Sequence, residues 1–140
     1  MMYAVLYVSK EVENLPDQTI ADISKVSSIN NARDQISGAL LYMGGEFLQI
    51  LEGEEEVLMQ TYQRIDADER HYASNLLFYG PTESRSFNNW DMTYSKVDIE
   101  KFKSRTGLES FSQFFQRCTD DKYLEMGLML FQEFSKVVSK

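Results

Sequence analysis

A primary amide stands in the middle of an apolar run, where its hydrogen-bonding groups need a partner. The run is FLQILEG, residues 47–53, and the amide belongs to Gln49. An amide carries two N–H donors and a carbonyl acceptor, and leaving such groups unpaired in an apolar layer costs about 1–3 kcal/mol. The alternation of side chains along strands places Gln49 on one face of its strand and Tyr7 on one face of the first strand, YAVLYV. The pattern therefore predicts that the Tyr7 hydroxyl meets Gln49 across a sheet.

Two interpretations of this pair stay open from the residues alone. Tyr7 and Gln49 either satisfy each other as an ordinary buried polar pair, or they contact a ligand. Asn30 and Asn31, which are adjacent in the sequence, also have either a structural or a ligand-binding interpretation. Both stand where the first predicted helix ends, and asparagine commonly takes the left-handed cap position there.

The other residue types exclude the commoner catalytic centres. A single histidine, His71, and a single cysteine, Cys118, do not supply a usual zinc ligand set or an internal disulfide. No glycine-rich phosphate loop and no G-x-S-x-G motif is present, and a hairpin turn explains Gly44 and Gly45. Most of the 22 acidic residues are expected on solvated faces. We therefore expect no metal site, no catalytic residues and no enzyme.

Composition narrows the class of protein further. The chain has 140 residues, 43% of them hydrophobic, which fits one globular domain. Its net charge of −8 and its isoelectric point near 4.6 disfavour a nucleic-acid partner, which requires a clustered basic face. The sequence contains no apolar run of about 20 residues and no basic, signal-like start. These features predict a cytoplasmic protein without a membrane span.

Hydrophobic periodicity predicts seven elements before residue 98. Strands are expected at 3–8, 36–43, 46–52, 75–80 and 88–97, and helices at 17–31 and 54–65. The Gly44–Gly45 pair joins the second and third strands as a hairpin. The order βαββαββ indicates an α+β, ferredoxin-like two-layer sandwich with a mixed five-stranded sheet.

The rest of the chain is predicted to form a helical cap. Phe111, Phe114, Phe115 and Cys118 follow the i, i+3, i+4, i+7 spacing of a helix, and residues 122–138 form a second, broadly apolar helix. We expect these two helices to cover the second face of the sheet. Part of their apolar surface is equally suited to a subunit interface, so a homo-oligomer is expected as well. The predicted division is residues 1–97 for the main domain and 98–140 for the cap.

Several motifs in order resemble the BLUF family, which senses blue light using flavin. They are Tyr7 and Ser9 in LYVSK, the pair Asn30-Asn31, ISGALLY, FLQILEG, YQRIDADERH and NNWDM, and together they cover residues 2–97. The resemblance implies a flavin, either FAD or the smaller FMN or riboflavin, held between residues 17–31 and 54–67. It assigns photoactive roles to Tyr7, Gln49, Ser9, Trp90 and Met92. It assigns flavin contacts to Gln49, Asn30, Asn31, Ile23, Lys25, Arg64 and Asp68.

The resemblance also implies a mechanism. Tyr7 gives an electron and a proton to the excited flavin through Gln49, and the reverse transfer leaves the amide rotated or tautomerised. The altered hydrogen bonds shift the absorption to the red, and the signal passes through the last strand and the C-terminal helices to a partner protein or to the assembly state. A flavin-dependent redox enzyme and a small-ligand regulatory module on the same fold are the alternatives.

Overall fold

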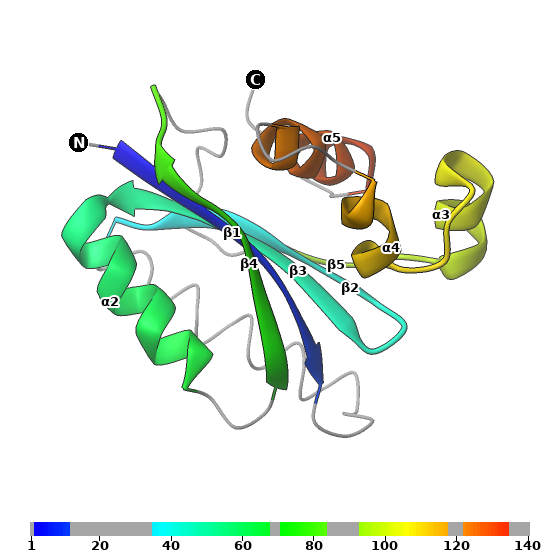
Figure 1. Ribbon diagram of the computed structural model, residues 1–140, viewed down its shortest axis with the longest axis horizontal. Coiled ribbons are helices and arrows are strands. Elements are labelled where there is room, and N and C mark those ends of the chain that lie inside the picture. The colour runs from blue at the N-terminus through cyan, green and yellow to red at the C-terminus, as the bar shows by residue number, and fades with distance from the viewer. Residues whose placement is uncertain (1, 12–34, 68–70, 84–92, 118–121, 135–140) are drawn as a thin grey trace.

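Five strands form one mixed sheet with helices on both faces. The computed structural model describes residues 2–11, 35–67, 71–83, 93–117 and 122–134, and Figure 1 shows their arrangement. The strands are β1 (Met2–Glu11), β2 (Ser37–Met43), β3 (Glu46–Glu54), β4 (His71–Pro81) and β5 (Thr93–Lys96), in the spatial order β4-β1-β3-β2-β5. All neighbours are antiparallel except β2 and β5, which are parallel. The predicted ferredoxin-like α+β class with a mixed five-stranded sheet is confirmed.

The β2–β3 hairpin sets the register at the centre of the sheet. Gly44 and Gly45 have φ values of 55° and 85°, so both adopt the left-handed conformation that a tight hairpin turn of this kind requires. The turn pairs Met43 with Glu46 and continues to Ser37 opposite Glu52. Because side chains alternate along each strand, this register decides which residues of β3 face each layer.

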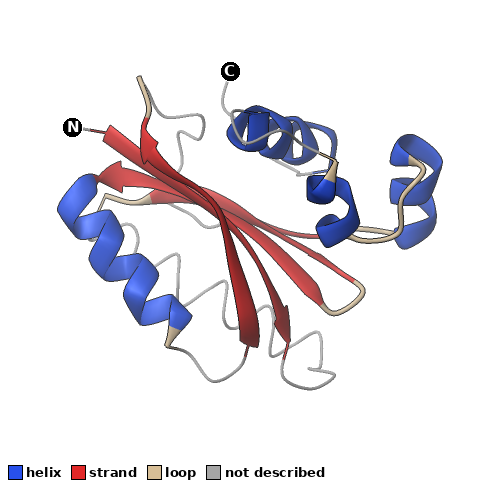
Figure 2. Cartoon of the chain, viewed as in Figure 1, coloured by secondary structure: helices blue, strands red, loops and turns tan. Residues whose placement is uncertain are grey.

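One face of the sheet packs against α2 (Glu55–Asp66), and Figure 2 shows that helix on the opposite side from the C-terminal helices. Glu55 and Glu56 occupy its first turn, where carboxylates interact favourably with the helix dipole. A buried apolar cluster lies on this face of the sheet. It consists of Val5, Tyr7, Ile36, Leu40, Tyr42, Phe47, Leu51 and Leu58.

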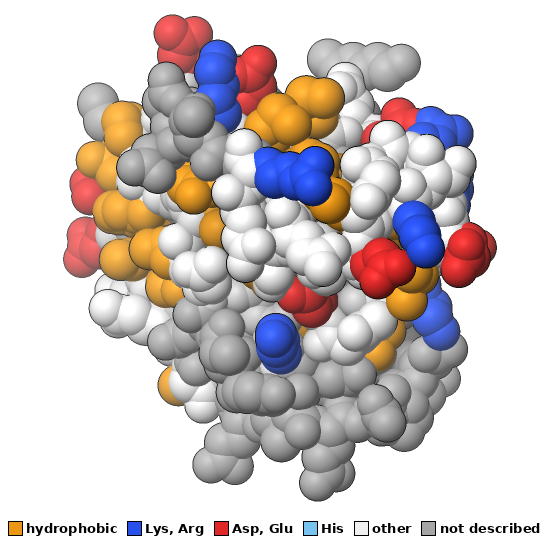
Figure 3. Space-filling model, turned by 45° about the vertical axis from the view of Figure 1, so that its right-hand side comes forward, with side chains coloured by type: hydrophobic (Ala, Val, Ile, Leu, Met, Phe, Trp, Pro, Cys, Tyr) orange, Lys and Arg blue, Asp and Glu red, His pale blue; other side chains and the backbone are white. Residues whose placement is uncertain are grey.

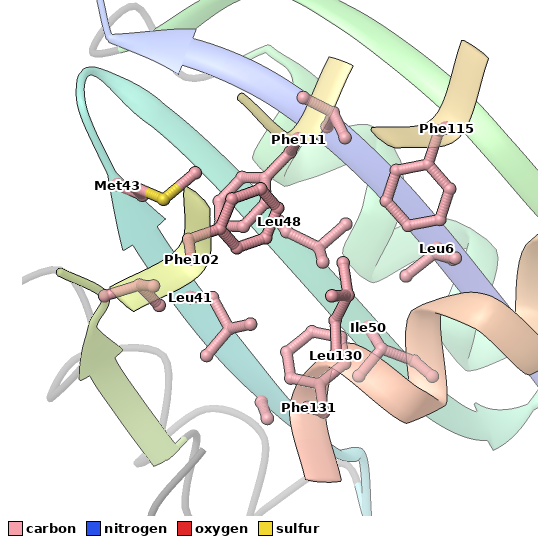
Figure 4. Close-up of a cluster of buried hydrophobic side chains, with 13 residues drawn as sticks. Leu6, Leu41, Met43, Leu48, Ile50, Phe102, Phe111, Phe115, Leu130 and Phe131 are labelled. Atoms are coloured by element: carbon pink, nitrogen blue, oxygen red, sulfur yellow. The ribbon is translucent and has the colours of Figure 1, made fainter. Parts of the chain in front are cut away.

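The opposite face carries the larger core, which it shares with three helices: α3 (Ile99–Thr106), α4 (Phe111–Gln116) and α5 (Tyr123–Phe134). Figure 4 shows side chains of β1, β2 and β3 pointing toward Phe102, Phe111, Phe115 and Phe131 of these helices. All four phenylalanines are at most 2% exposed. Their burial holds the cap helices on the sheet through the hydrophobic effect.

The cap differs from its prediction by one helix. Two helices were expected after residue 98, whereas residues 98–117 and 122–134 contain three, because α3 was not predicted. Its eight residues bury one side chain, Phe102, so no periodic pattern marks the helix. Its signals are the caps: Asp98 accepts a hydrogen bond from the Glu100 amide, and Gly107 ends the helix at φ 77°.

Element boundaries also differ. β1 and β4 extend beyond the predicted ranges 3–8 and 75–80, because their long mutual pairing carries both into polar residues. The predicted helix at 17–31, residues 88–92 of the last strand and residues 135–138 of the last helix lie outside the described residues. No helix in the described ranges is long and apolar enough to cross a membrane.

Candidate functional site

Tyr7 and Gln49 meet as predicted, on the α2 face of the sheet. They are register partners on the adjacent antiparallel strands β1 and β3. The Tyr7 hydroxyl donates a hydrogen bond to Oε1 of Gln49. The residues are 1% and 6% exposed, so the bond lies in a buried environment where polar groups interact strongly. This bond joins a phenol and the carbonyl end of an amide.

The pair has mostly apolar neighbours. Leu40 of β2 is the register partner of Gln49 on the other side, and Phe47 lies two positions before Gln49 on the same face. Ser9 is 1% exposed and pairs with Phe47, which places its hydroxyl-bearing side chain on the face of Tyr7 and Gln49. Tyr7, Gln49 and Ser9 therefore share one face of the sheet, and the photoactive role of Ser9 stays a prediction.

A second tyrosine contacts the pair from the helix. The ring of Tyr62 lies edge-on to the ring of Tyr7, with centroids 5.2 Å apart and an interplanar angle of 66°. Sequence periodicity indicates only that Tyr62 or Thr61 faces the sheet, and it does not reveal this contact. The contact adds an aromatic wall beside Tyr7, in the arrangement that aromatic pairs prefer.

The helix α2 forms one boundary of the site along its length. Leu58 is fully buried, and the hydroxyl of buried Thr61 donates to the Val57 carbonyl at 2.9 Å. Arg64 is exposed in the last turn, where a cation interacts favourably with the helix dipole. At the other end, Tyr79 donates to a carboxylate oxygen of Glu55 at 3.0 Å. Desolvation, and then this hydrogen bond, raise the pKa of Tyr79.

The remaining predicted site residues lie outside the described residues. They are Ile23, Lys25, Asn30, Asn31, Asp68, Trp90 and Met92. Asp68 follows two residues after the end of α2, and Met92 directly precedes β5. Their roles stay predictions.

Comparison with known families identifies the domain. The family model described as sensors of blue light using FAD matches residues 2–93. The chain belongs to the BLUF family. The matched range contains Tyr7, Gln49 and the whole sheet except β5, of which it includes only the first residue, Thr93.

Relatives of this BLUF protein include light-regulated proteins of very different size. Photoactivated adenylate cyclase subunit alpha of Euglena gracilis is 35% identical over 98 residues, which are 70% of this chain and 9% of that protein. The blue light- and temperature-regulated antirepressor BluF of Escherichia coli K12 is 32% identical over 72 residues, which are 51% of this chain and 18% of that protein. The chain therefore spans less than a fifth of the length of both relatives.

Two solved structures of BlsA match nearly the whole chain. BlsA in its ground state has a TM-score of 0.75 and 29% identity, over 92% of this chain and 89% of that one. BlsA in its photo-activated state has a TM-score of 0.76, with the same identity, over 93% and 94% of the two chains. The likeness extends beyond the family match at residue 93, so it includes cap helices of this BLUF protein.

The described part of the α2 face fits the flavin that BLUF domains bind. A flavin ring has apolar faces and one edge that carries both donors and acceptors. The apolar cluster around Tyr7 supplies a matching surface, and the Gln49 amide offers both hydrogen-bond polarities at its centre. The described residues around Tyr7 and Gln49 therefore fit a flavin in their chemistry.

Proposed function

We propose that this protein is a blue-light photoreceptor in which the Tyr7–Gln49 pair converts light absorption into a changed hydrogen-bond pattern. The observation that carries the proposal is the buried bond from the Tyr7 hydroxyl to Gln49 Oε1. Membership in the BLUF family supports the light-sensing part of the proposal. We further propose that the domain acts as a sensor and not as an enzyme.

The chain's own residues account for the switching step. A bound flavin excited by blue light supplies a strong oxidant. Tyr7 is the proposed electron donor, and its hydroxyl donates a hydrogen bond to an acceptor, Gln49 Oε1. Transfer of the Tyr7 proton to Oε1, balanced by transfer of an Nε2 proton to the reduced flavin, would give the imidic acid tautomer of Gln49. Return of the electron and of that second proton from the flavin to the Tyr7 oxygen would restore the phenol and leave Gln49 as its tautomer.

The altered Gln49 is the stored signal. Rotation of the amide exchanges Oε1 and Nε2, and tautomerisation changes which end donates. Either change removes the acceptor that the Tyr7 hydroxyl uses in this structure, so Tyr7 must find a new hydrogen-bond arrangement. Because the pair is buried, bulk water does not replace the lost bond, so the altered state is higher in free energy and reverts in the dark.

The proposed cofactor is FAD, as in the description of the family, with FMN and riboflavin as smaller alternatives. The proposed flavin contacts are Gln49, Ile23, Lys25, Asn30, Asn31, Arg64 and Asp68. Of these, Arg64 is the described cation, exposed at the end of α2. An exposed arginine there is suited to a phosphate at the rim of a pocket.

Signal output is proposed to run through the last strand and the cap to a partner protein or to the assembly state. Trp90 and Met92 precede β5 and are the proposed relay on that route. The division into residues 1–97 and 98–140, a cytoplasmic location and a homo-oligomer belong to the same proposal. The E. coli relative supports a protein partner, because its name describes it as an antirepressor.

The test is the visible absorption spectrum of the purified protein before and after a blue flash. The expected result is a flavin spectrum that shifts to the red and recovers in the dark. Tyr7→Phe should keep the flavin and abolish the shift. Tyr79→Phe is the matched control, because it also removes one phenolic hydroxyl, from the Glu55 contact, and should keep the full shift. A full shift in Tyr7→Phe would refute the relay, and irreversible bleaching would indicate a redox enzyme.

A further inference from the structure

A buried carboxylate lies on the same strand as Gln49 but faces the other layer. Glu46 is the first residue of β3, directly after the hairpin turn, and is 6% exposed. It stands three residues before Gln49, so the alternation of side chains directs it toward the cap. A charged group in such a place is costly unless its oxygens are hydrogen-bonded.

Both oxygens of Glu46 bind the beginning of α4. Oε1 accepts a hydrogen bond from the Phe111 amide at 2.8 Å, and Oε2 accepts one from the Ser112 hydroxyl at 2.5 Å. Phe111 is the first residue of α4, and its amide is among those that a helix itself leaves unpaired. We call this pair of bonds, from Glu46 to Phe111 and Ser112, the β3–α4 clamp.

The clamp holds a central part of the cap core. The Phe111 side chain is fully buried and meets the Phe102 ring of α3 edge to face, with centroids 5.5 Å apart. Figure 1 shows the tip of the β2–β3 hairpin extending below α3 and α4, where Glu46 begins β3. A displacement of β3 therefore moves Glu46. Through the two bonds of the clamp, this movement acts on the beginning of α4 and on the aromatic core of the cap.

We propose that Glu46 is the positioning residue that couples the light-driven change at Gln49 to the cap, by release of the β3–α4 clamp in the light. This inference rests on the proposed photoreceptor function. Gln49 and Glu46 lie three residues apart on β3, the central strand, all nine residues of which pair with β1 without interruption. A hydrogen bond forms only within a narrow range of donor–acceptor distances. A small shift of β3 therefore breaks or restores the bonds that Glu46 accepts from α4.

Hydrogen exchange of residues 111–116, measured in the dark and under blue light on the flavin-loaded full chain, tests the clamp. In wild type, these amides are expected to exchange about tenfold faster in the light, since local opening governs their exchange. Glu46→Gln keeps the shape but loses the charge and one acceptor. It keeps one carbonyl acceptor, so its dark rate should lie between the dark and light rates of wild type, with a smaller further change on illumination.

Two further variants make the test specific. Ser112→Ala removes only one of the two bonds and should give an intermediate dark rate, with Phe111 still held. Glu54→Gln removes a charge from the exposed end of the same strand and should behave as wild type. The red shift of the flavin should persist in Glu46→Gln, because Glu46 faces away from the Tyr7–Gln49 pair.

The outcomes separate the coupling from the photochemistry. A wild-type red shift with equal exchange of residues 111–116 in light and dark overturns the coupling alone. A full light–dark difference in Glu46→Gln does the same, because the clamp would then be unnecessary. A wild type without any red shift overturns the proposed function, and the coupling with it.

Discussion

The Tyr7–Gln49 bond should be measurable as a coupling energy in the stability of the dark protein. The perturbations are Tyr7→Phe, Gln49→Leu and the double variant, which together form a double-mutant cycle. Tyr7→Phe deletes only the hydroxyl and keeps the ring in the apolar cluster. Gln49→Leu replaces the amide by an apolar side chain of similar size.

The magnitude follows from burial and from what each change leaves behind. Tyr7→Phe leaves the Gln49 carbonyl, 6% exposed, without the donor it has in this structure. Such a loss costs about 1–3 kcal/mol, whereas removing both partners is much less costly. The double variant should therefore be more stable than the sum of the single losses by about 1–2 kcal/mol.

The assay is equilibrium unfolding in urea, in the dark, with the same excess of flavin in every sample. The excess is required because bound ligand adds its own stabilisation. In a thermal scan, 1 kcal/mol corresponds to about 2–4 °C for a chain approaching 150 residues. Tyr79→Phe serves as the control and should change stability by less than about 0.5 kcal/mol, since its bond is exposed. Additive losses in the cycle would refute the reasoning that the pair is a buried, mutually satisfied unit.

Two other changes test the core and the cofactor. Gly127→Ala in α5 should destabilise the protein by about 1–3 kcal/mol, although alanine normally favours a helix, because the added methyl would lie 2.6 Å from Cδ2 of Leu6, which is fully buried; an increased melting temperature would contradict this. Asn31→Ala should lower flavin occupancy after dialysis, measured by the flavin-to-protein absorbance ratio, and unchanged occupancy would argue against a pocket role for Asn31.

Strong local signals made most of the sheet predictable. The glycine pair fixed the hairpin, and the alternation around Gln49 fixed which residues of β3 face α2. The helix α3 escaped because eight residues with one buried side chain do not produce a periodic pattern. The full length of β1 and β4 was not predicted for a different reason. Pairing between these two strands, and not their local composition, determines where they end.

The centre of the site was predictable for a physical reason. A buried amide in an apolar strand requires a hydrogen-bond partner, and the alternation of side chains on the neighbouring strand identified Tyr7 as that partner. The Tyr62 contact was not predictable, because it depends on how α2 is placed over the sheet. The burial of Glu46 was not predicted, because a carboxylate next to a glycine turn is normally expected to be exposed to solvent. Only the tertiary structure shows that α4 covers it.

The cap itself presents a mixed surface to possible partners. In the view of Figure 3, basic and acidic side chains are interspersed with apolar ones. One exposed ion pair of the cap joins Arg105 of α3 to Glu133 of α5. Because exposed pairs of this kind contribute little energy, the placement of the cap helices depends mainly on the buried phenylalanines and on the β3–α4 clamp. A change in the clamp is therefore a change in how the cap surface is arranged.

Two output routes from Gln49 impose different requirements on the sheet. The route to β5 must cross β2, because Leu40 is the register partner of both Gln49 and Tyr94. It therefore needs a lateral change in strand pairing. The route to the cap stays within β3, from Gln49 to Glu46, and needs only a small shift of one strand. If Glu46→Gln weakens the light response of residues 111–116 but leaves that of residues 93–96, the two routes diverge at β3 and operate independently.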